Sequence, residues 1–359
     1  MLLNYDTMEH QQIIFSNDIP GSLETVLKGL DFNKVVIITD VNAHQFAFPK
    51  IADSPVMKGI PCIVIKSGDT CKTIETATTV WKQLEAEGAT RRTVVINMGG
   101  GVVTDLGGFA ASVFKRGLRF INVPTTLLGA VDAAIGGKTG VNFNGLKNEI
   151  GVFNEACAVV VSTLFFDTLP PTELKSGYAE MLKHGLLSDR SYFANLLNHE
   201  ILTDDREQLL GLLERSVIIK RDIVAADPHE QGLRRALNLG HTAGHAFESL
   251  AMKRMEPVPH GYAVAWGLVV ELILSHMIYK FPSDILHMVA AFVRDNYGTF
   301  AITCDDYDTL IALMRHDKKS IGGEINCSLL ADIGNVKLGT VVSSDDIKAA
   351  LDIYRDLLQ

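Results

Sequence analysis

The sequence predicts an α/β protein with two domains, a mostly parallel β-sheet domain over residues 1–170 and an all-α domain over residues 171–359. In the first half, short apolar runs alternate with stretches of helical periodicity, which is the pattern of βαβ units. Pro170-Pro171 interrupts this alternation, and the pattern after Thr172 is almost entirely helical. A length of 359 residues leaves room for two domains of ordinary size.

The composition indicates a soluble globular protein, with 47% hydrophobic and 21% charged residues. A net charge of −9 argues against general nucleic-acid binding, although a locally cationic pocket can still bind a small anion. Five dispersed cysteines without a C-x-x-C pair indicate reduced thiols, so we expect a cytoplasmic protein. The start shows no signal-peptide pattern. The apolar stretch 261–279 contains Glu271 and His276, which favours a buried helix over a membrane span.

Apolar runs in the first half predict the strands of the sheet, at residues 34–39, 62–65, 92–97, 119–123 and 157–161. Between the second and third runs, a helix is expected to present one face through Ile74, Thr78, Trp81 and Leu84.

Three glycines, Gly99 to Gly101, follow the third predicted strand and precede a predicted helix. This combination can cradle a phosphate, because glycines admit it closely and the N–H groups of the helix start face it. A lone glycine triplet is more often a tight turn, and the G-x-G-x-x-G fingerprint is absent. Its place at the carboxyl end of a strand nevertheless favours a dinucleotide. Asp40 and Asn42 would meet the ribose hydroxyls, unless they only cap a loop.

A second glycine-rich segment, Gly136-Gly137-Lys138-Thr139-Gly140, resembles part of a P-loop. Ala133 stands where the first glycine of that motif is required, so we reject an ATP-hydrolysing enzyme. Lysines among glycines suit an anionic ligand, although most lysines are simply solvated.

Histidines and an acid in the second half predict a divalent-metal site. His241 and His245 are four residues apart and share a helix face, and His260 follows a Pro-rich bend. Glu180 lies with Lys183 in a mostly apolar helix, so its carboxylate needs a partner such as a metal. Glu180 with two histidines would leave coordination positions open for substrate. The alternatives are a surface ion pair and histidines that only satisfy core hydrogen bonds.

Together these features indicate hydride-transfer chemistry. A dinucleotide would remove hydride from an alcohol carbon, a metal would polarise the oxygen, and lysines and arginines would bind a phosphate or carboxylate. Residue patterns alone therefore predict a metal- and dinucleotide-dependent enzyme that acts on an anionic polyol.

Several motifs in a fixed order make the chain similar to the 3-dehydroquinate synthase family of sugar phosphate cyclases, from about Asp40 to Lys319. They are Gly99–Asp105, Val123–Leu128, Val131-Asp132 with Gly136–Gly140, Lys147-Asn148, Gly177–Glu180 with Lys183, and Leu237–His245. The resemblance implies a Rossmann-like NAD-binding domain, an α-helical metal- and substrate-binding domain, and an active site in the cleft between them. It also implies a homodimer.

The reaction implied by the resemblance converts 3-deoxy-D-arabino-heptulosonate 7-phosphate to 3-dehydroquinate and phosphate in the shikimate pathway. The steps are alcohol oxidation at C5, β-elimination of phosphate, re-reduction, ring opening and an intramolecular aldol, with NAD regenerated in each turnover. The C5 ketone acidifies the C6 proton, and the substrate phosphate itself helps to remove it.

The resemblance further implies roles for residues at matching positions. Zn²⁺ or Co²⁺ would be held by Glu180, His241 and His260, whereas His245 would face the substrate. The residues implied in NAD binding are Asp40, Asn42, Asp69, Lys72, Gly101, Val102, Val103, Thr104, Asp105, Thr125, Thr126, Lys138, Lys147, Phe165 and Thr168. Those implied in substrate binding are Asp132, Lys138, Lys147, Asn148, Lys183, Lys220, Arg234, Asn238, His245 and Lys319 (or Lys318). Glu230 would lie near metal and substrate, and Arg116 would reach the phosphate across the dimer interface.

Some residues depart from those common in the family, namely Thr104, Leu146, Ala243 and Tyr262. They bear on loop geometry and pocket packing more than on activity. Two other enzyme classes stay open: a sugar phosphate cyclase that takes sedoheptulose 7-phosphate or glucose 6-phosphate, and a metal-dependent NAD polyol dehydrogenase. Asn238 and His245 favour the dehydroquinate type. A non-catalytic scaffold would show eroded metal ligands and lysines, which this sequence does not.

Overall fold

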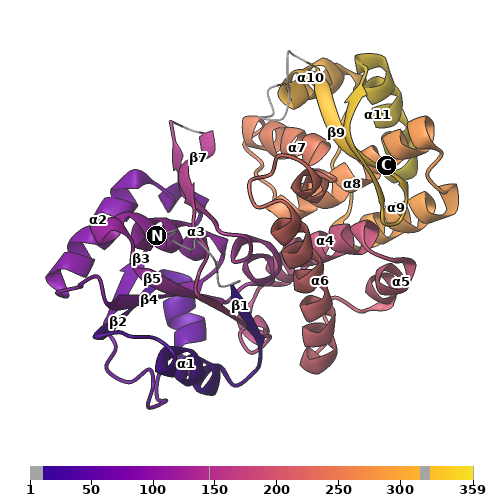
Figure 1. The fold of residues 1–359 in the computed structure, drawn as a ribbon. Helices are drawn as coiled ribbons and strands as arrows, with labels where there is room; N and C mark the ends of the chain where they lie inside the picture. Colours follow the sequence, from indigo (N-terminus) through magenta and orange to yellow (C-terminus); the bar gives the residue numbers. More distant parts are fainter. Residues whose placement is uncertain (1–10, 145, 316–323, 359) are drawn as a thin grey trace, which may run out of the picture. The chain divides into compact units, whose positions relative to one another are not determined.

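A computed structural model describes residues 11–144, 146–315 and 324–358 of the chain. The chain forms two compact units (Figure 1). The first unit contains the residues up to Leu169 together with Asp205–Glu214, and the second contains Pro170–Asp204 and the residues from Arg215 onward.

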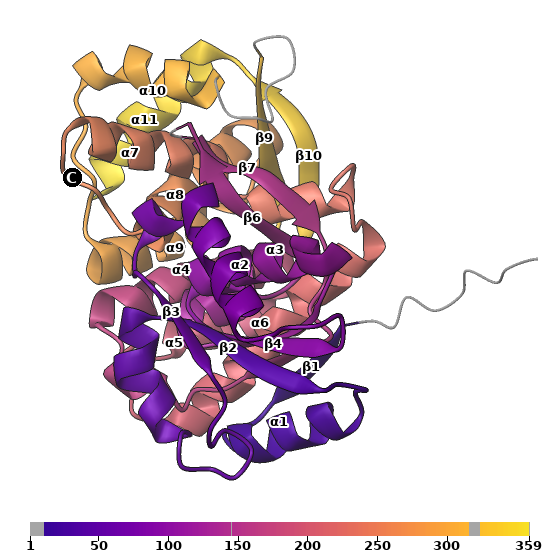
Figure 2. The same ribbon diagram turned by 90° about the vertical axis from the view of Figure 1, so that its left-hand side faces the viewer.

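The first unit is built on a six-stranded sheet with helices on both faces. Its strands are β1 (Gln12–Phe15), β2 (Lys34–Asp40), β3 (Cys62–Ile65), β4 (Thr93–Gly99), β5 (Arg119–Pro124) and β8 (Ala158–Val161). Its longer helices are α1 (Ile19–Lys28), α2 (Ile74–Ala86) and α3 (Gly101–Val113). In Figures 1 and 2, α2 and α3 cover one face of the sheet and α1 lies on the other.

The strands lie in the order β1-β8-β5-β4-β2-β3, and every neighbouring pair is parallel. The predicted parallel sheet is therefore confirmed. The strand predicted at residues 92–97 continues to Gly99, and β1 was not predicted. From β2 the chain moves outward to β3, whereas from β4 it moves outward to β5 in the opposite direction. This divergence between β2 and β4 is a topological switch point, where open α/β sheets bind ligands at the carboxyl ends of their strands.

The buried face of α2 differs from the predicted one. Ala77, Val80 and Leu84 are buried, whereas Thr78 is exposed and donates its hydroxyl to the Ile74 carbonyl. The buried side of α2 is shifted around the helix from the predicted side, because α2 packs against both the sheet and α3.

The glycine-rich segment Gly136–Gly140, for which the sequence indicated an anionic ligand, leads into an antiparallel hairpin that was not predicted. Its strands are β6 (Lys138–Phe143) and β7 (Leu146–Phe153). Two glycines permit the close strand approach, because a Cβ on Gly140 or on Gly151 would lie 2.5 or 2.2 Å from a carbonyl oxygen of the opposite strand.

The second unit is mainly helical. Its helices are α4 (Pro171–Leu187), α5 (Arg190–Asn198), α7 (His241–Lys253), α8 (His260–Tyr279), α9 (Ser283–Tyr297), α10 (Tyr307–Arg315) and α11 (Ser344–Leu358). Helix α6 (Arg206–Ala226) begins in the first unit's segment and ends in the second. The two-domain α/β fold is confirmed with one correction, since the second unit is not entirely helical. It also contains the hairpin of β9 (Ile325–Asp332) and β10 (Asn335–Val342).

Helix α8 is the core of the second unit and packs against α4, α7, α9, α11 and β9. It is long and apolar enough to cross a membrane, with a mean hydropathy of 1.6 over its most apolar window. However, 78% of that window is buried inside the protein. The apolar stretch 261–279 is thus part of a buried helix, as the presence of Glu271 and His276 indicated.

Helices α7 and α8 touch through their backbones. A Cβ on Gly267 of α8 would lie 2.1 Å from the Gly240 carbonyl oxygen and 2.5 Å from the Gly244 nitrogen. Both contacts are with backbone atoms, which cannot move aside as a flexible side chain can.

We therefore expect Gly267→Ala to destabilise the protein by about 3 kcal/mol, at the upper end of the usual cost of overpacking. Thermal unfolding followed by circular dichroism measures the effect. Gly211→Ala is the matched control, because Gly211 is at an exposed position of α6 and none of the described residues outside that helix places an atom within 4 Å of its added Cβ. It should be neutral or stabilising by up to about 1 kcal/mol. Equal melting temperatures for the two variants would contradict the backbone contact.

Candidate functional site

Asp40 ends β2 on one side of the switch point. Its Oδ1 accepts hydrogen bonds from the N–H groups of Asn42 and Ala43, at 2.8 and 3.0 Å, and from the Ser67 hydroxyl at 2.8 Å. The carboxylate therefore closes the turn that follows the strand, so the loop-capping alternative is realised. A role for Asp40 and Asn42 in binding ribose stays a prediction.

The glycine turn occupies the other side of the switch point. Gly99 ends β4 and α3 begins at Gly101, so the predicted succession of strand, turn and helix is present. A Cβ on Gly99 would lie 2.4 Å from Val103, and one on Gly101 would lie 3.2 Å from Ala133. The glycines thus serve close packing, and the turn places the start of α3, with its N–H groups that lack intrahelical partners, at the carboxyl end of β4.

Three threonines border this turn. Thr104 donates its hydroxyl to the Gly101 carbonyl at 3.1 Å, which keeps the larger residue within the first helical turn. The Thr125 N–H donates to the Gly99 carbonyl at 2.9 Å, and the Thr126 hydroxyl accepts the N–H of Gly129 at 3.0 Å. The residue that departs from the family pattern, Thr104, is therefore accommodated without opening the turn.

Lys72 joins a residue implied in NAD binding to one implied in substrate binding. Its ammonium is buried and donates to both the Asp105 carboxylate and the Asn148 side-chain carbonyl. The β6–β7 hairpin brings Asn148 to this position, and Asn148 has a positive φ of 53°. Lys147 lies beside it, with its ammonium 3.8 Å from a carboxylate oxygen of Asp69.

The other candidates of the first unit lie at its turns and element ends. Asp132 is in a short helical turn over Gly129–Ala133, and Lys138 is exposed at the start of β6. Arg116 is exposed in a turn after α3. In the turn Phe166–Thr168, the hydroxyl of exposed Thr168 donates to the carbonyl of the preceding, buried Phe165.

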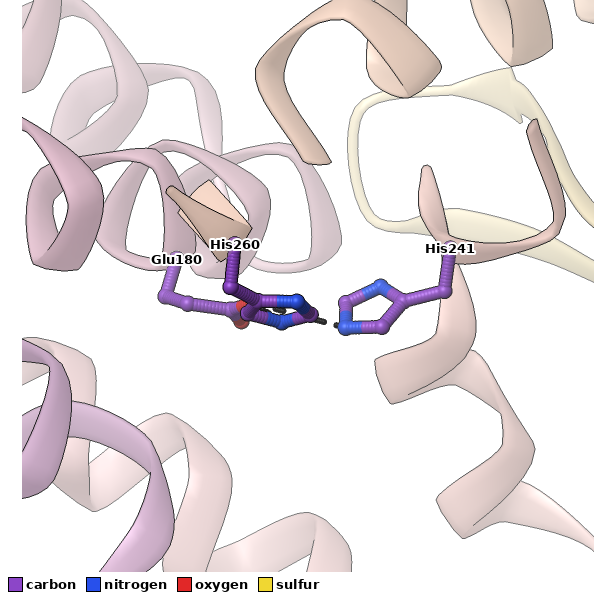
Figure 3. Close-up of side chains that lie close together, drawn as sticks. All are labelled: Glu180, His241 and His260. Atoms are coloured by element: carbon purple, nitrogen blue, oxygen red, sulfur yellow. Dashed lines mark ion pairs between the residues drawn. The ribbon is translucent and has the colours of Figure 1, made fainter. Parts of the chain in front are cut away.

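Glu180, His241 and His260 come together in the second unit, from α4, α7 and α8. One ligand atom of each lies within 4.8 Å of the other two. The Nε2 atoms of His241 and His260 are 3.4 and 3.6 Å from Glu180 Oε1. Figure 3 shows the three side chains pointing toward one another.

These residues fit a metal ion. Glu180 Oε1 is buried and accepts no hydrogen bond from the residues that the structure describes, and the carboxylate is completely inaccessible to solvent. Leaving such an oxygen unsatisfied costs free energy. Two imidazole nitrogens and one carboxylate oxygen are the donor set that Zn²⁺ and Co²⁺ accept, and three protein ligands leave positions open for a substrate.

The remaining polar atoms of these ligands are held by neighbours. The Lys183 ammonium donates to Glu180 Oε2. The Nδ1 of His241 lies 3.1 Å from the Leu239 carbonyl, and the Nδ1 of His260 lies 3.5 Å from Glu248 Oε2. Partners of this kind fix ring orientation and tautomer in metal sites, leaving each Nε2 for coordination.

The electrostatics differ between the two imidazoles. Burial lowers the pKa of His241 to about 4, even though Glu180 acts in the opposite direction. Burial also acts to lower the pKa of His260, but the carboxylates of Glu180 and Glu248 raise it to about 9. Burial acts to raise the pKa of Glu180, but Lys183 and His241 hold it well below its usual range. His241 therefore presents a neutral imidazole to a cation, whereas a cation would displace a proton from His260.

His245 is not a member of this ligand group. Its ring centroid lies 5.3 Å from that of His241 and 6.0 Å from that of His260. Of the alternatives left open by the shared helix face, the geometry favours the one in which only His241 of this pair binds metal.

A loop before α7 carries further candidates. The Asp227 carboxylate accepts N–H groups from Gln231, Gly232 and Arg234 at 2.7–3.0 Å, which folds the loop back on itself. The Arg234 guanidinium donates to the Pro228 carbonyl at 2.7 Å. In the same loop the Asn238 amide donates to Glu230 Oε1 at 3.0 Å. Lys220 is buried on α6, and Lys319 and Lys318 lie outside the described residues.

Sequence reasoning missed two carboxylates near the ligands, Glu248 and Glu271. Glu248 lies seven residues after His241, a spacing that returns to the same helix face. Glu271 was visible as an acid within an apolar helix, which signals a buried carboxylate that needs partners. Its partners belong to another helix and could not be identified from local spacing.

Comparison with known proteins identifies the family. The profile of the 3-dehydroquinate synthase N-terminal domain matches residues 62–176, and that of the C-terminal domain matches residues 177–320. The 3-dehydroquinate synthase of Parabacteroides distasonis is 44% identical over 349 residues, which cover 97% of this chain and 99% of that protein. The chain belongs to the 3-dehydroquinate synthase family. The family's enzyme from Thermococcus kodakarensis is 37% identical, with 93% of each chain covered.

Solved structures share the fold. A 2-epi-5-epi-valiolone synthase from Streptomyces hygroscopicus, with NAD⁺ and Zn²⁺ bound, superimposes with a TM-score of 0.85 at 25% identity and covers 99% of both chains. A 2-deoxy-scyllo-inosose synthase gives 0.80 at 23% identity, covering 94% of this chain and 95% of that one. A glycerol dehydrogenase from Schizosaccharomyces pombe gives 0.64 at 16% identity, covering 98% and 90%. The fold of the 3-dehydroquinate synthase family thus extends to dehydrogenases.

We expect His241→Ala to lose most bound metal and His245→Ala to retain it, because only His241 contributes to the ligand group. Metal content per chain after dialysis, measured by inductively coupled plasma mass spectrometry, checks this. His245→Ala is the matched control, since it removes the same side chain one helical turn away. Loss of metal from both variants would contradict the assignment of His241, and not His245, as a metal ligand.

Proposed function

We propose that this protein is a 3-dehydroquinate synthase, a phosphate-eliminating carbon–oxygen lyase that converts 3-deoxy-D-arabino-heptulosonate 7-phosphate to 3-dehydroquinate in the shikimate pathway. The observation that carries the proposal is the joint presence of two family domains and the Glu180–His241–His260 donor set. The cofactors are NAD and Zn²⁺ or Co²⁺, since the valiolone synthase structure contains NAD⁺ and Zn²⁺ and the 2-deoxy-scyllo-inosose synthase structure contains NAD⁺ and Co²⁺.

The chemistry that bound groups supply is hydride acceptance and return by NAD and polarisation of an alcohol or carbonyl oxygen by the metal. Glu180, His241 and His260 would hold the metal. Lys183 occupies Glu180 Oε2, which leaves Oε1, the oxygen near the Nε2 atoms of both histidines, as the oxygen that would bind the ion. Buried Lys183 and Lys220 supply positive charge that favours an anionic substrate and the enolate character that develops during elimination.

The remaining roles follow the family assignment and are proposals. NAD is bound by the start of α3 from Gly101 to Asp105 and by Asp40 and Asn42 at the end of β2. Further NAD contacts come from Asp69, Lys72, Thr125, Thr126, Phe165 and Thr168. Lys138 and Lys147 serve both ligands. Substrate is bound by Asp132, Asn148, Arg234, Asn238, His245 and Lys319, with Glu230 near the metal. We further propose a cytoplasmic homodimer in which Arg116 reaches the partner's substrate phosphate.

A second candidate is another sugar phosphate cyclase, and it is favoured by the 0.85 TM-score to a valiolone synthase. Sequence identity weighs against it, since that structure is 25% identical whereas a named 3-dehydroquinate synthase is 44% identical over nearly the whole chain. A polyol dehydrogenase shares only the fold, at 16% identity.

Substrate identity is tested by measuring phosphate release. We expect release with 3-deoxy-D-arabino-heptulosonate 7-phosphate and none with sedoheptulose 7-phosphate or glucose 6-phosphate. NADH absorbance should show no net accumulation, because the hydride is returned within each turnover. Turnover with only another sugar phosphate would replace the proposed substrate, and steady NADH production from a simple polyol would indicate a dehydrogenase.

Lys183→Ala should reduce kcat by about a hundredfold or more, the usual cost of removing one preorganised charge from a reacting centre. NAD affinity should stay unchanged, because Lys183 and the NAD-binding candidates lie in different units. Steady-state kinetics and NAD titration by fluorescence measure the two quantities.

Lys175→Ala is the control for this variant. Lys175 is on the same helix, eight residues before Lys183 in the sequence. Its ammonium donates to the Asn296 carbonyl and not to Glu180. Its kcat should match that of the unsubstituted protein. Equal loss of turnover and NAD affinity in Lys183→Ala would contradict a substrate role.

A further inference from the structure

The carboxylate of Glu271 joins α8 to the start of α7. Glu271 is completely buried in the middle of α8. Its Oε2 accepts the N–H of Gly240 at 2.7 Å, and its Oε1 accepts the N–H groups of Thr242 and Ala243 at 2.9 and 3.2 Å. These three donors surround His241, the first residue of α7.

The start of α7 needs this carboxylate because it lacks the usual cap. A helix start leaves its first N–H groups without intrahelical partners, and a Ser, Thr, Asp or Asn side chain normally accepts one of them. The cap position here is Gly240, which has a left-handed φ of 79° and no side chain. Glu271 takes over that task from another helix. Its negative charge also lies at the positive end of the α7 dipole, where anions are stabilised.

The surroundings leave this segment little freedom. A Cβ on Gly240 would lie 2.8 Å from Leu268 Cδ2, and one on Gly267 would lie 2.1 Å from the Gly240 carbonyl oxygen. The turn before α7 is therefore packed against α8 directly beside Glu271. A shift of the carboxylate has to move the turn as well.

His241 is held on both sides by this arrangement. The backbone before and after it is fixed by Glu271, and its Nδ1 faces the Leu239 carbonyl at 3.1 Å. Helix α8 also begins at His260, the other imidazole of the metal group. One rigid helix thus carries one ligand directly and holds the backbone of the second.

We propose that Glu271 is a positioning residue of the metal centre, which sets the place of His241 Nε2 through the backbone of Gly240, Thr242 and Ala243. It is not one of the three residues of the ligand group. The inference rests on the proposed metal site and goes beyond it, because it makes metal affinity depend on a carboxylate outside the ligand set. Substitution of residues that orient metal ligands typically weakens metal binding tenfold to a hundredfold.

The test compares Glu271→Gln with Ser275→Ala in the full-length protein. Gln has the shape of Glu, but its amide group directs N–H hydrogens at one of the backbone N–H groups and lacks the charge. Ser275 lies one turn further along α8, is equally buried, and accepts the Leu330 N–H at 3.0 Å. Its hydroxyl also donates to the backbone carbonyl of Glu271 at 2.6 Å. Ser275→Ala thus removes buried polar contacts of the same helix but leaves the Glu271 carboxylate and its contacts with α7 in place.

Zn²⁺ affinity is measured by competition with a chromophoric chelator, and the visible absorption spectrum of the Co²⁺ form reports ligand geometry. Glu271→Gln should weaken Zn²⁺ binding by about tenfold to a hundredfold and change the Co²⁺ spectrum. Ser275→Ala should lower the melting temperature and leave both metal readouts unchanged. Glu271→Asp, which keeps the charge but shortens the reach, is measured in the same way and replaces the Gln variant if that variant is not recovered folded.

Unchanged Zn²⁺ affinity and Co²⁺ spectrum in the Glu271 variants would overturn the inference. An equal loss of affinity in Ser275→Ala would also overturn it, because the effect would then come from lower stability of α8. If the unsubstituted protein binds neither metal, the proposed metal site itself fails, and this result is distinct from the other two.

Discussion

The backbone contact between α7 and α8 is the constraint on which the second unit depends. Side chains normally keep helix axes 8–10 Å apart, and only glycines allow the backbones themselves to meet. Here Gly240, Gly244 and Gly267 lack a Cβ at the points where the two backbones lie closest. The close approach lets a carboxylate of one helix reach the N–H groups of the other, and histidines from both helices lie in the same ligand group.

Burial of charge follows from the same packing. Glu180 has no access to solvent, so its carboxylate is stable only among groups that compensate it. Lys183 takes one oxygen, and two imidazoles face the other. A cation bound at Oε1 would complete this arrangement. The same residues thus form the candidate metal site and compensate the buried charge of Glu180.

The sequence predicted the parallel sheet and the glycine turn well, because strands such as β2 and β4 are continuous apolar runs and local patterns suffice to identify them. It did not predict the hairpin at 138–153, where glycines that resembled an anion loop serve close strand pairing. It also missed β9, whose short apolar run cannot be distinguished from a buried helix segment by periodicity. For the metal group, spacing alone left His241 and His245 equivalent. Family resemblance separated them, and the contact of His241 with an acid 61 positions earlier in the chain gives the physical reason. Glu271 could not be assigned at all, since its three donors come from a helix start some 30 residues away.

The origin of the three ligands on three separate helices has a consequence for folding. Glu180 and His260 are separated by 80 positions in the sequence, and His241 lies between them. An ion bound to all three closes these long chain segments as a disulfide would, and so reduces the conformational freedom of any partly unfolded state. A bound ion would therefore raise the free energy of unfolding, in addition to its part in turnover. Removal of the ion would then lower the stability of the fold as well as the activity.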